Sequence, residues 1–107
     1  MINADMIAAL EKKGFNRWTK GNMDRLYINA SQLGLECGYY NTGNIKWAEF
    51  CGNSISNCEA RRMKAAKTYI DINTGKAHSD NYTLQGRVEE ILAELDEQKG
   101  ETEHENA

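Results

Sequence analysis

The stretch FNRWTKGNMDRLYINA, from Phe15 to Ala30, predicts a β-hairpin and decides the fold expected for this chain. Gly21 and Asn22 sit between two runs that alternate apolar and polar residues, and both tolerate the positive φ that a tight hairpin turn requires. The chain should therefore form two short antiparallel strands here.

The alternation also gives the hairpin two different faces. Leu26 and Ile28 share one face of the second strand, while Arg25 and Tyr27 share the other. On the first strand, Trp18 alternates with polar and charged residues. One face can pack on a core, and the other presents arginine beside aromatic rings. This pattern indicates a binding surface.

Length and composition indicate one soluble domain. The chain has 107 residues, 40% apolar and 27% charged, which suits a single small globule. No apolar run approaches the roughly 20 residues of a membrane span, and the first residues lack a secretory signal. We expect a cytoplasmic protein with one α+β domain over residues 1–97 and a disordered acidic tail over residues 98–107.

The formal net charge of −3 is unevenly distributed. Residues 1–87 hold 12 of the 13 Lys and Arg and 8 of the 16 Asp and Glu, so the body carries +4. Residues 88–107 hold one Lys and 8 acids, so the end carries −7. A basic body attracts phosphate or an acidic protein surface. The acidic end has two readings, which are solubility and charge mimicry of nucleic acid toward an arginine-lined channel.

The remaining local signals predict the order α-β-β-β-α-β-α. Asn3 can cap a first helix over 4–13, and Ser56 with Glu59 matches a capping box for a helix reaching Lys67. Strands are expected over 45–51 and 68–72, and an apolar stripe beginning at Leu84 predicts a final amphipathic helix capped by Asp80 or Asn81. The stretch 31–40 fits a single helical turn or a compact loop.

These elements do not alternate as right-handed βαβ units would. A small antiparallel sheet of three to five strands with about three helices is therefore favoured, in the α+β class.

Sequence motifs of enzymes and cofactor sites are absent from the chain, which predicts a non-enzymatic protein without cofactor. A set of His78, Asp80 and Tyr82, with Asp71 nearby, is the one candidate for acid–base chemistry, as in a small hydrolase or nuclease. Cysteines 37, 51 and 58 show no zinc-like spacing and read as reduced thiols, two of them expected to be buried.

Basic and aromatic residues gather in two places and form the candidate contact surface for a partner or nucleic acid. The hairpin group comprises Arg17, Trp18, Lys20, Arg25 and Tyr27, and the helix group comprises Arg61, Arg62, Lys64 and Lys67. Arginine binds phosphate or carboxylate in fork geometry, and aromatic rings stack on bases or anchor protein interfaces. The alternatives are core packing for Trp18 and a solvated helix face for the second group.

Five short motifs over residues 14–75 carry a resemblance. They are RWTKG from Arg17, DRLYIN from Asp24, ISN from Ile55, ARR from Ala60 and YID from Tyr69. Together they resemble small accessory proteins of phages and conjugative elements in gut Firmicutes. Several small proteins of that setting are anti-CRISPR inhibitors, which bind an effector nuclease without catalysis. The resemblance assigns no role to any single residue.

Three functions follow from the sequence. The leading hypothesis is a non-enzymatic protein of a mobile element that engages a nucleic-acid-handling protein or nucleoprotein, as an anti-CRISPR-like inhibitor would. The alternative is a module that binds DNA or RNA directly through the same basic and aromatic residues. The third is the hydrolase or nuclease centred on His78.

Overall fold

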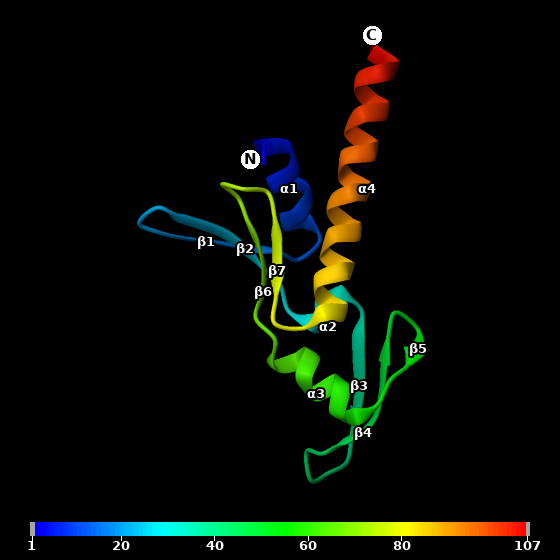
Figure 1. The fold of residues 1–107 in the computed structure, drawn as a ribbon. Helices are drawn as coiled ribbons and strands as arrows, with labels where there is room; N and C mark the ends of the chain where they lie inside the picture. Colours follow the sequence, from blue (N-terminus) through cyan, green and yellow to red (C-terminus); the bar gives the residue numbers. More distant parts are fainter. Residues whose placement is uncertain (1, 107) are drawn as a thin grey trace.

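The computed structural model describes residues 2–106 of the chain, and the side chains of residues 2–97 (Figure 1). The helices in these residues are α1 (Ala4–Lys12), α2 (Ala30–Leu33), α3 (Asn57–Ala65) and α4 (Tyr82–Asn106). The strands are β1 (Asn16–Lys20), β2 (Met23–Tyr27), β3 (Leu35–Tyr39), β4 (Ile45–Phe50), β5 (Asn53–Ser54), β6 (Thr68–Asp71) and β7 (Ala77–Ser79). The predicted α+β class is confirmed.

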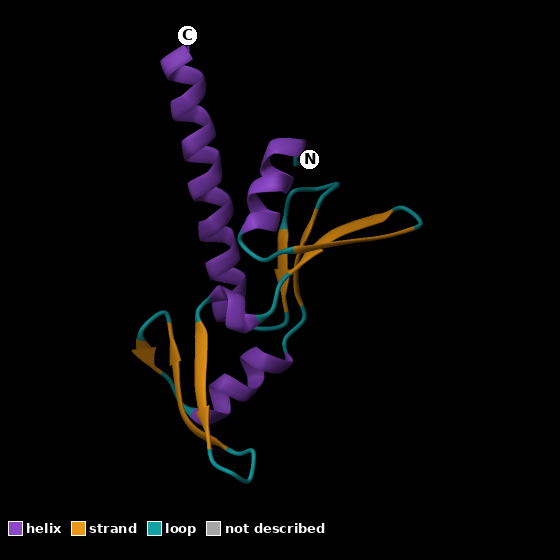
Figure 2. Cartoon of the chain, turned by 180° about the vertical axis from the view of Figure 1, so that it is seen from behind, coloured by secondary structure: helices purple, strands orange, loops and turns teal. Residues whose placement is uncertain are grey.

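The strands divide between two antiparallel sheets instead of joining in one (Figure 2). The four-stranded sheet has the order β1-β2-β6-β7, and the three-stranded sheet has the order β3-β4-β5. The predicted hairpin is β1 and β2, with Trp18 opposite Arg25. It projects away from the helices in both views (Figures 1 and 2).

Pairing of β2 with β6 joins the hairpin to the rest of the chain. Leu26 lies opposite Ile70, and both side chains are completely buried. Ala77 of β7 continues this inward row and is also buried. Because side chains alternate along a strand, the neighbours of these residues must point to the other face of the sheet.

Helices α1 and α4 supply apolar side chains to the core below this sheet. Helix α4 packs against β6 and β7. The predicted stripe on α4 is confirmed, since Leu84, Val88 and Ile91 are buried and Leu92 and Leu95 pack against the core. Full burial of such side chains contributes roughly 1.5–3 kcal/mol each. At the start of α1 the predicted cap forms, because the Asn3 side chain accepts the backbone N–H of Met6.

The stretch 31–40 corrects the prediction. Only its beginning is a helical turn, α2, and the remainder is strand β3, which pairs with β4. Helix α3 packs against this second sheet and buries Ala60 and Met63. The predicted turn or loop is therefore a strand that builds a second sheet.

Helix α3 begins as predicted but ends early. The Ser56 hydroxyl accepts the backbone N–H of Glu59, which is one half of the expected capping box. The helix ends at Ala65 because Ala66 is extended, so Lys67 lies beyond the helix that was predicted to contain it. Asn81 caps α4 by accepting the backbone N–H of Leu84, and its amide donates to Glu59 of α3. This one side chain joins the two helices.

The predicted tail falls at the end of α4. The side chains of residues 98–106 and the whole of Ala107 lie outside the described residues, so disorder over 98–107 stays a prediction. No helix in the described part of the chain has the length and hydrophobicity to cross a membrane.

The contact between the Trp47 indole and Gly38 gives the first mutational prediction. A Cβ atom added at Gly38 would lie 2.0 Å from Nε1 of Trp47, the cross-strand neighbour of that glycine. Gly38→Ala should displace the indole outward. Because Trp47 is 45% exposed, the domain should lose at most about 1 kcal/mol, the low end of the cost of overpacking. Urea unfolding followed by tryptophan fluorescence measures both effects.

Gly86 on α4 provides the matched control, because no atom lies within 4 Å of an added Cβ there. Gly86→Ala should stabilise the domain by about 0.5–1 kcal/mol through helix propensity. Equal stability changes in the two variants would contradict the packing of Trp47 against Gly38.

Candidate binding face on the four-stranded sheet

Four rings form a continuous row across the face of the four-stranded sheet that points away from the core. Trp18 of β1 meets Tyr27 edge-on at 6.1 Å between ring centroids. Tyr27 lies 5.2 Å from Tyr69 of β6, and Tyr69 stacks at 5.1 Å on His78 of β7. Each strand contributes one ring because Trp18, Tyr27, Tyr69 and His78 all occupy outward positions in the register. We call these four residues the aromatic row.

Arg25 is fixed against the middle of the aromatic row. Its Nη1 donates a hydrogen bond to the Tyr27 hydroxyl at 2.9 Å, and its guanidinium carbon lies 4.2 Å from the Tyr69 ring centroid. The hydrogen bond to Tyr27 is the main reason that the pKa of Arg25 is raised, with Asp71 adding a smaller charge effect. The predicted surface of arginine beside aromatic rings therefore exists around Arg25.

The ring of Tyr69 has neighbours on both sides. Arg25 reaches it from β2, and His78 reaches it from β7, on the opposite side of β6. Offset stacking and cation–π contacts of this kind stabilise a sheet face. Because these two contacts occupy the Tyr69 ring, it presents its edge, and not a free face, to a partner.

The outer end of the row is the most open part of the hairpin. Trp18 is 38% exposed and Met23 is 42% exposed, and every residue of β1 is classed as exposed. Lys20 lies opposite Met23 at the hairpin tip. Exposed tryptophan and methionine beside an arginine is the composition that protein interfaces favour.

Lys67 belongs to this face and not to the α3 group. It lines a pocket of about 400 Å³ together with Arg25, Tyr69 and His78. The backbone of Lys67 is held by Asp80, whose carboxylate accepts its N–H and whose N–H donates to its carbonyl. Sequence spacing assigned Lys67 to a helix, but the fold brings it to the sheet.

The prediction that the basic and aromatic residues of the hairpin share one surface is wrong for Arg17. It lies opposite Leu26, on the other face from the aromatic row. There it forms a two-bond ion pair with Asp24, with Nε and Nη2 each donating to a carboxylate oxygen at 3.0 and 2.7 Å. Its donors serve the hairpin itself, so Arg17 is removed from the candidate face.

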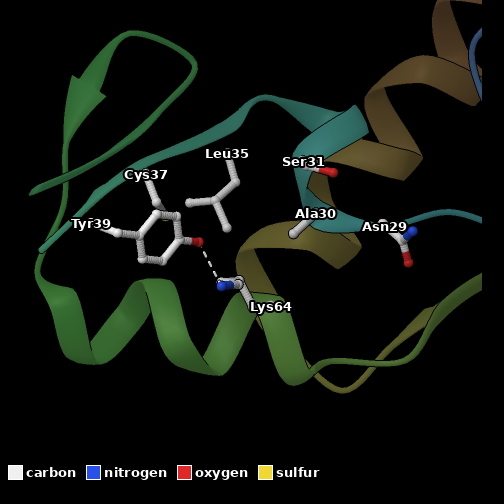
Figure 3. Close-up of a pocket in the computed structure, with 7 residues that line it drawn as sticks. All are labelled: Asn29, Ala30, Ser31, Leu35, Cys37, Tyr39 and Lys64. Carbon is white, nitrogen blue, oxygen red and sulfur yellow. Dashed lines mark hydrogen bonds between the residues drawn. The ribbon is translucent and has the colours of Figure 1, made fainter. Parts of the chain in front are cut away.

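The remaining residues of the helix group are also dispersed. Lys64 donates a 2.6 Å hydrogen bond to the Tyr39 hydroxyl (Figure 3), and this bond raises the pKa of Lys64. The pair lines a separate pocket between α3 and β3 that also includes Cys37 (Figure 3). Arg62 pairs with Glu59 at 3.6 Å, and Arg61 is exposed on α3. Tyr39 itself is 48% exposed.

The acid–base set around His78 is only partly assembled. His78 and Asp80 line the same pocket, but Tyr82 is 91% exposed and lines a different one. Asp71 accepts the backbone N–H groups of Asn73 and Thr74 in the turn. Within the described residues, no three His, Cys, Asp or Glu side chains gather as metal ligands would. Cys51 and Cys58 are exposed and Cys37 is half-buried, which corrects the expectation of buried thiols.

Sequence reasoning missed Tyr69 and Met23 as members of the face. Tyr69 alternates with the buried Ile70, and this local signal places it outward. What the sequence does not show is the β2–β6 register that sets Tyr69 opposite Tyr27. No family model, curated protein or solved structure matches this chain.

The Arg17–Asp24 pair gives a pH prediction. Hydrogen bonding to Arg17 lowers the pKa of Asp24, so the pair stabilises the hairpin above the unfolded pKa of about 3.9 and is lost as pH falls through the lower folded pKa. Arg17→Gln should raise the pKa of Asp24 toward its ordinary value. Carboxyl ¹³C NMR titration measures this, and Arg61→Gln is the control. An unchanged Asp24 titration in Arg17→Gln would contradict the ion pair.

Proposed function

We propose that this chain is a non-enzymatic binding protein that docks on another protein through the aromatic row. The observation that carries the proposal is the exposed end of the row, where Trp18 and Met23 stand beside the fixed Arg25. Aromatic residues, Met and Arg are the residue types enriched in the buried centres of protein interfaces. Because Arg25 is already held by two rings, little side-chain entropy is lost when it binds.

The packing of the rings favours a protein over a nucleic-acid strand. Single-stranded nucleic acid binds by stacking bases on free aromatic faces. Both sides of Tyr69 are taken by Arg25 and His78. A protein surface can use ring edges.

The setting of the proposed partner comes from the sequence resemblance. Several small accessory proteins of phages and conjugative elements are anti-CRISPR inhibitors that bind an effector nuclease. We therefore propose a partner that handles nucleic acid, with anti-CRISPR-like inhibition of an effector nuclease as the leading case and the cytoplasm as the place. The exposed acids of α4, such as Glu94 and Glu97, would suit contact with an arginine-lined channel of that partner.

Site-specific cross-linking tests the docking face. A photo-reactive amino acid at position 18 should capture a nucleic-acid-handling protein in cells that carry the mobile element. The same probe at position 82 is the control, because Tyr82 is an exposed aromatic residue of α4 that lines a different pocket from Tyr69 and His78. Mass spectrometry then identifies the captured protein.

Affinity for the purified partner gives the quantitative check. Trp18→Ala should raise Kd at least about thirtyfold, because loss of an interface anchor costs about 2 kcal/mol or more. Tyr82→Ala should leave Kd unchanged. If both variants bind like the wild type, the aromatic row is not the docking face.

Direct binding of nucleic acid is the second candidate, favoured by the edge position of Trp18 with Lys20 two residues later. One free indole can stack on a base while the lysine meets phosphate. Titration of fluorescent single-stranded DNA and RNA at two salt concentrations tests it. A direct binder should lose affinity by about 0.7 log units per log unit of salt for each phosphate contact. Absence of binding at low salt would remove this candidate.

A further inference from the structure

A pocket of about 400 Å³ opens where the four-stranded sheet meets the connection after α3. Its lining includes three nitrogen-bearing side chains from three different segments, which are Arg25 of β2, Lys67 before β6 and His78 of β7. Residues 25, 67 and 78 are far apart in sequence, so only the strand pairing brings these donors together.

The three side chains are held in place, and each keeps an N–H group that can still donate a hydrogen bond. Arg25 uses one N–H of Nη1 for Tyr27, and its Nε is buried without a hydrogen-bond partner in the described part of the chain. Its Nη2 makes no hydrogen bond among the described residues and is the end that can meet an ion. Within the same residues, no hydrogen bond or ion pair is made by the Lys67 ammonium group, although its backbone is anchored to Asp80 by two bonds. His78 is oriented by stacking on Tyr69 and keeps at least one ring N–H to donate.

Two carboxylates near the pocket would repel a bound anion. Asp80 lines the pocket, and Asp71 faces Arg25 across the strand pair. Both have structural tasks, because Asp80 accepts the N–H of Lys67 and Asp71 accepts two N–H groups of its turn. Among the described residues, neither acid forms an ion pair with Arg25 or Lys67.

We propose that this pocket binds the phosphate group of a phosphate monoester. A guanidinium fork, an ammonium group and an imidazole on different sides match the several oxygens of a tetrahedral dianion. A carboxylate carries a single negative charge, whereas a phosphate monoester carries about two on three oxygens, so Coulomb attraction to the guanidinium and ammonium groups favours the phosphate. The proposal does not depend on the docking partner, because these side chains can bind the ion in the isolated chain.

Isothermal titration with inorganic phosphate at constant ionic strength tests this directly. The wild-type chain should bind phosphate, and acetate should bind at least about tenfold more weakly because it uses fewer charged hydrogen bonds. In ¹⁵N NMR, phosphate should shift the amide signals of Arg25, Lys67 and His78. Constant ionic strength is needed because salt screens surface charge.

Two variants that remove charges of opposite sign should change phosphate affinity in opposite directions. Lys67→Gln should weaken phosphate binding about tenfold by removing a charged hydrogen bond, and it leaves the fold intact because the side chain has no partner among the described residues. Asp80→Asn should strengthen binding about twofold to fivefold, since it removes a like charge and keeps an oxygen for the N–H of Lys67. Lys46→Gln on β4 is the matched control and should bind like the wild type.

Three results would overturn the proposal. They are equal binding of phosphate and acetate, an unchanged Kd in Lys67→Gln, and weaker binding in Asp80→Asn. If cross-linking at position 18 captures no protein, the phosphate titrations are unaffected. The docking proposal and the phosphate proposal can therefore be rejected independently.

Discussion

The pairing of β2 with β6 is the constraint on which the rest of the structure depends. It sets Leu26 opposite Ile70 in the core and, one residue along, Tyr27 opposite Tyr69 on the surface. A shift of one residue would exchange the two faces of a strand, placing Tyr69 inside and Ile70 outside. Burial of Leu26 and Ile70 therefore fixes the aromatic row as well as the core. The contacts of Arg25 are a consequence of hydrophobic packing on the reverse side of the sheet.

Local signals in the sequence were sufficient for most individual elements. The Gly21-Asn22 turn, the Asn3 and Asn81 caps and the stripe on α4 each act over about a dozen residues or fewer, and each formed as predicted. Such features depend on backbone preference and side-chain spacing, which a single sequence displays. The α+β class followed from their order.

Features that depend on distant residues could not be predicted in the same way. Strand β3 carries Gly38 where an outward side chain would normally mark a strand, because the Trp47 indole from β4 occupies that space. Alternation of side chains along the strands places Arg17 and Arg25 on opposite faces of the hairpin. The ion pair between Arg17 and Asp24, however, depends on the hairpin register. Likewise, Lys67 joins Arg25 only because β6 pairs with β2. Pairings of this kind close long loops, and one sequence gives no signal for them.

The position of Lys67 bears on both the proposed docking face and the proposed phosphate site. The Lys67 backbone makes two hydrogen bonds with Asp80, one to its carboxylate and one from its N–H, and they fix the point at which the chain leaves α3 and enters β6. Asn81, the next residue, joins the start of α4 to Glu59 of α3. The base of the pocket is thus held by elements packed on the core, and only the side-chain ends remain free. Preorganised donors of this kind bind without a large loss of entropy, so a few charged groups are enough on a face whose rings are already packed together.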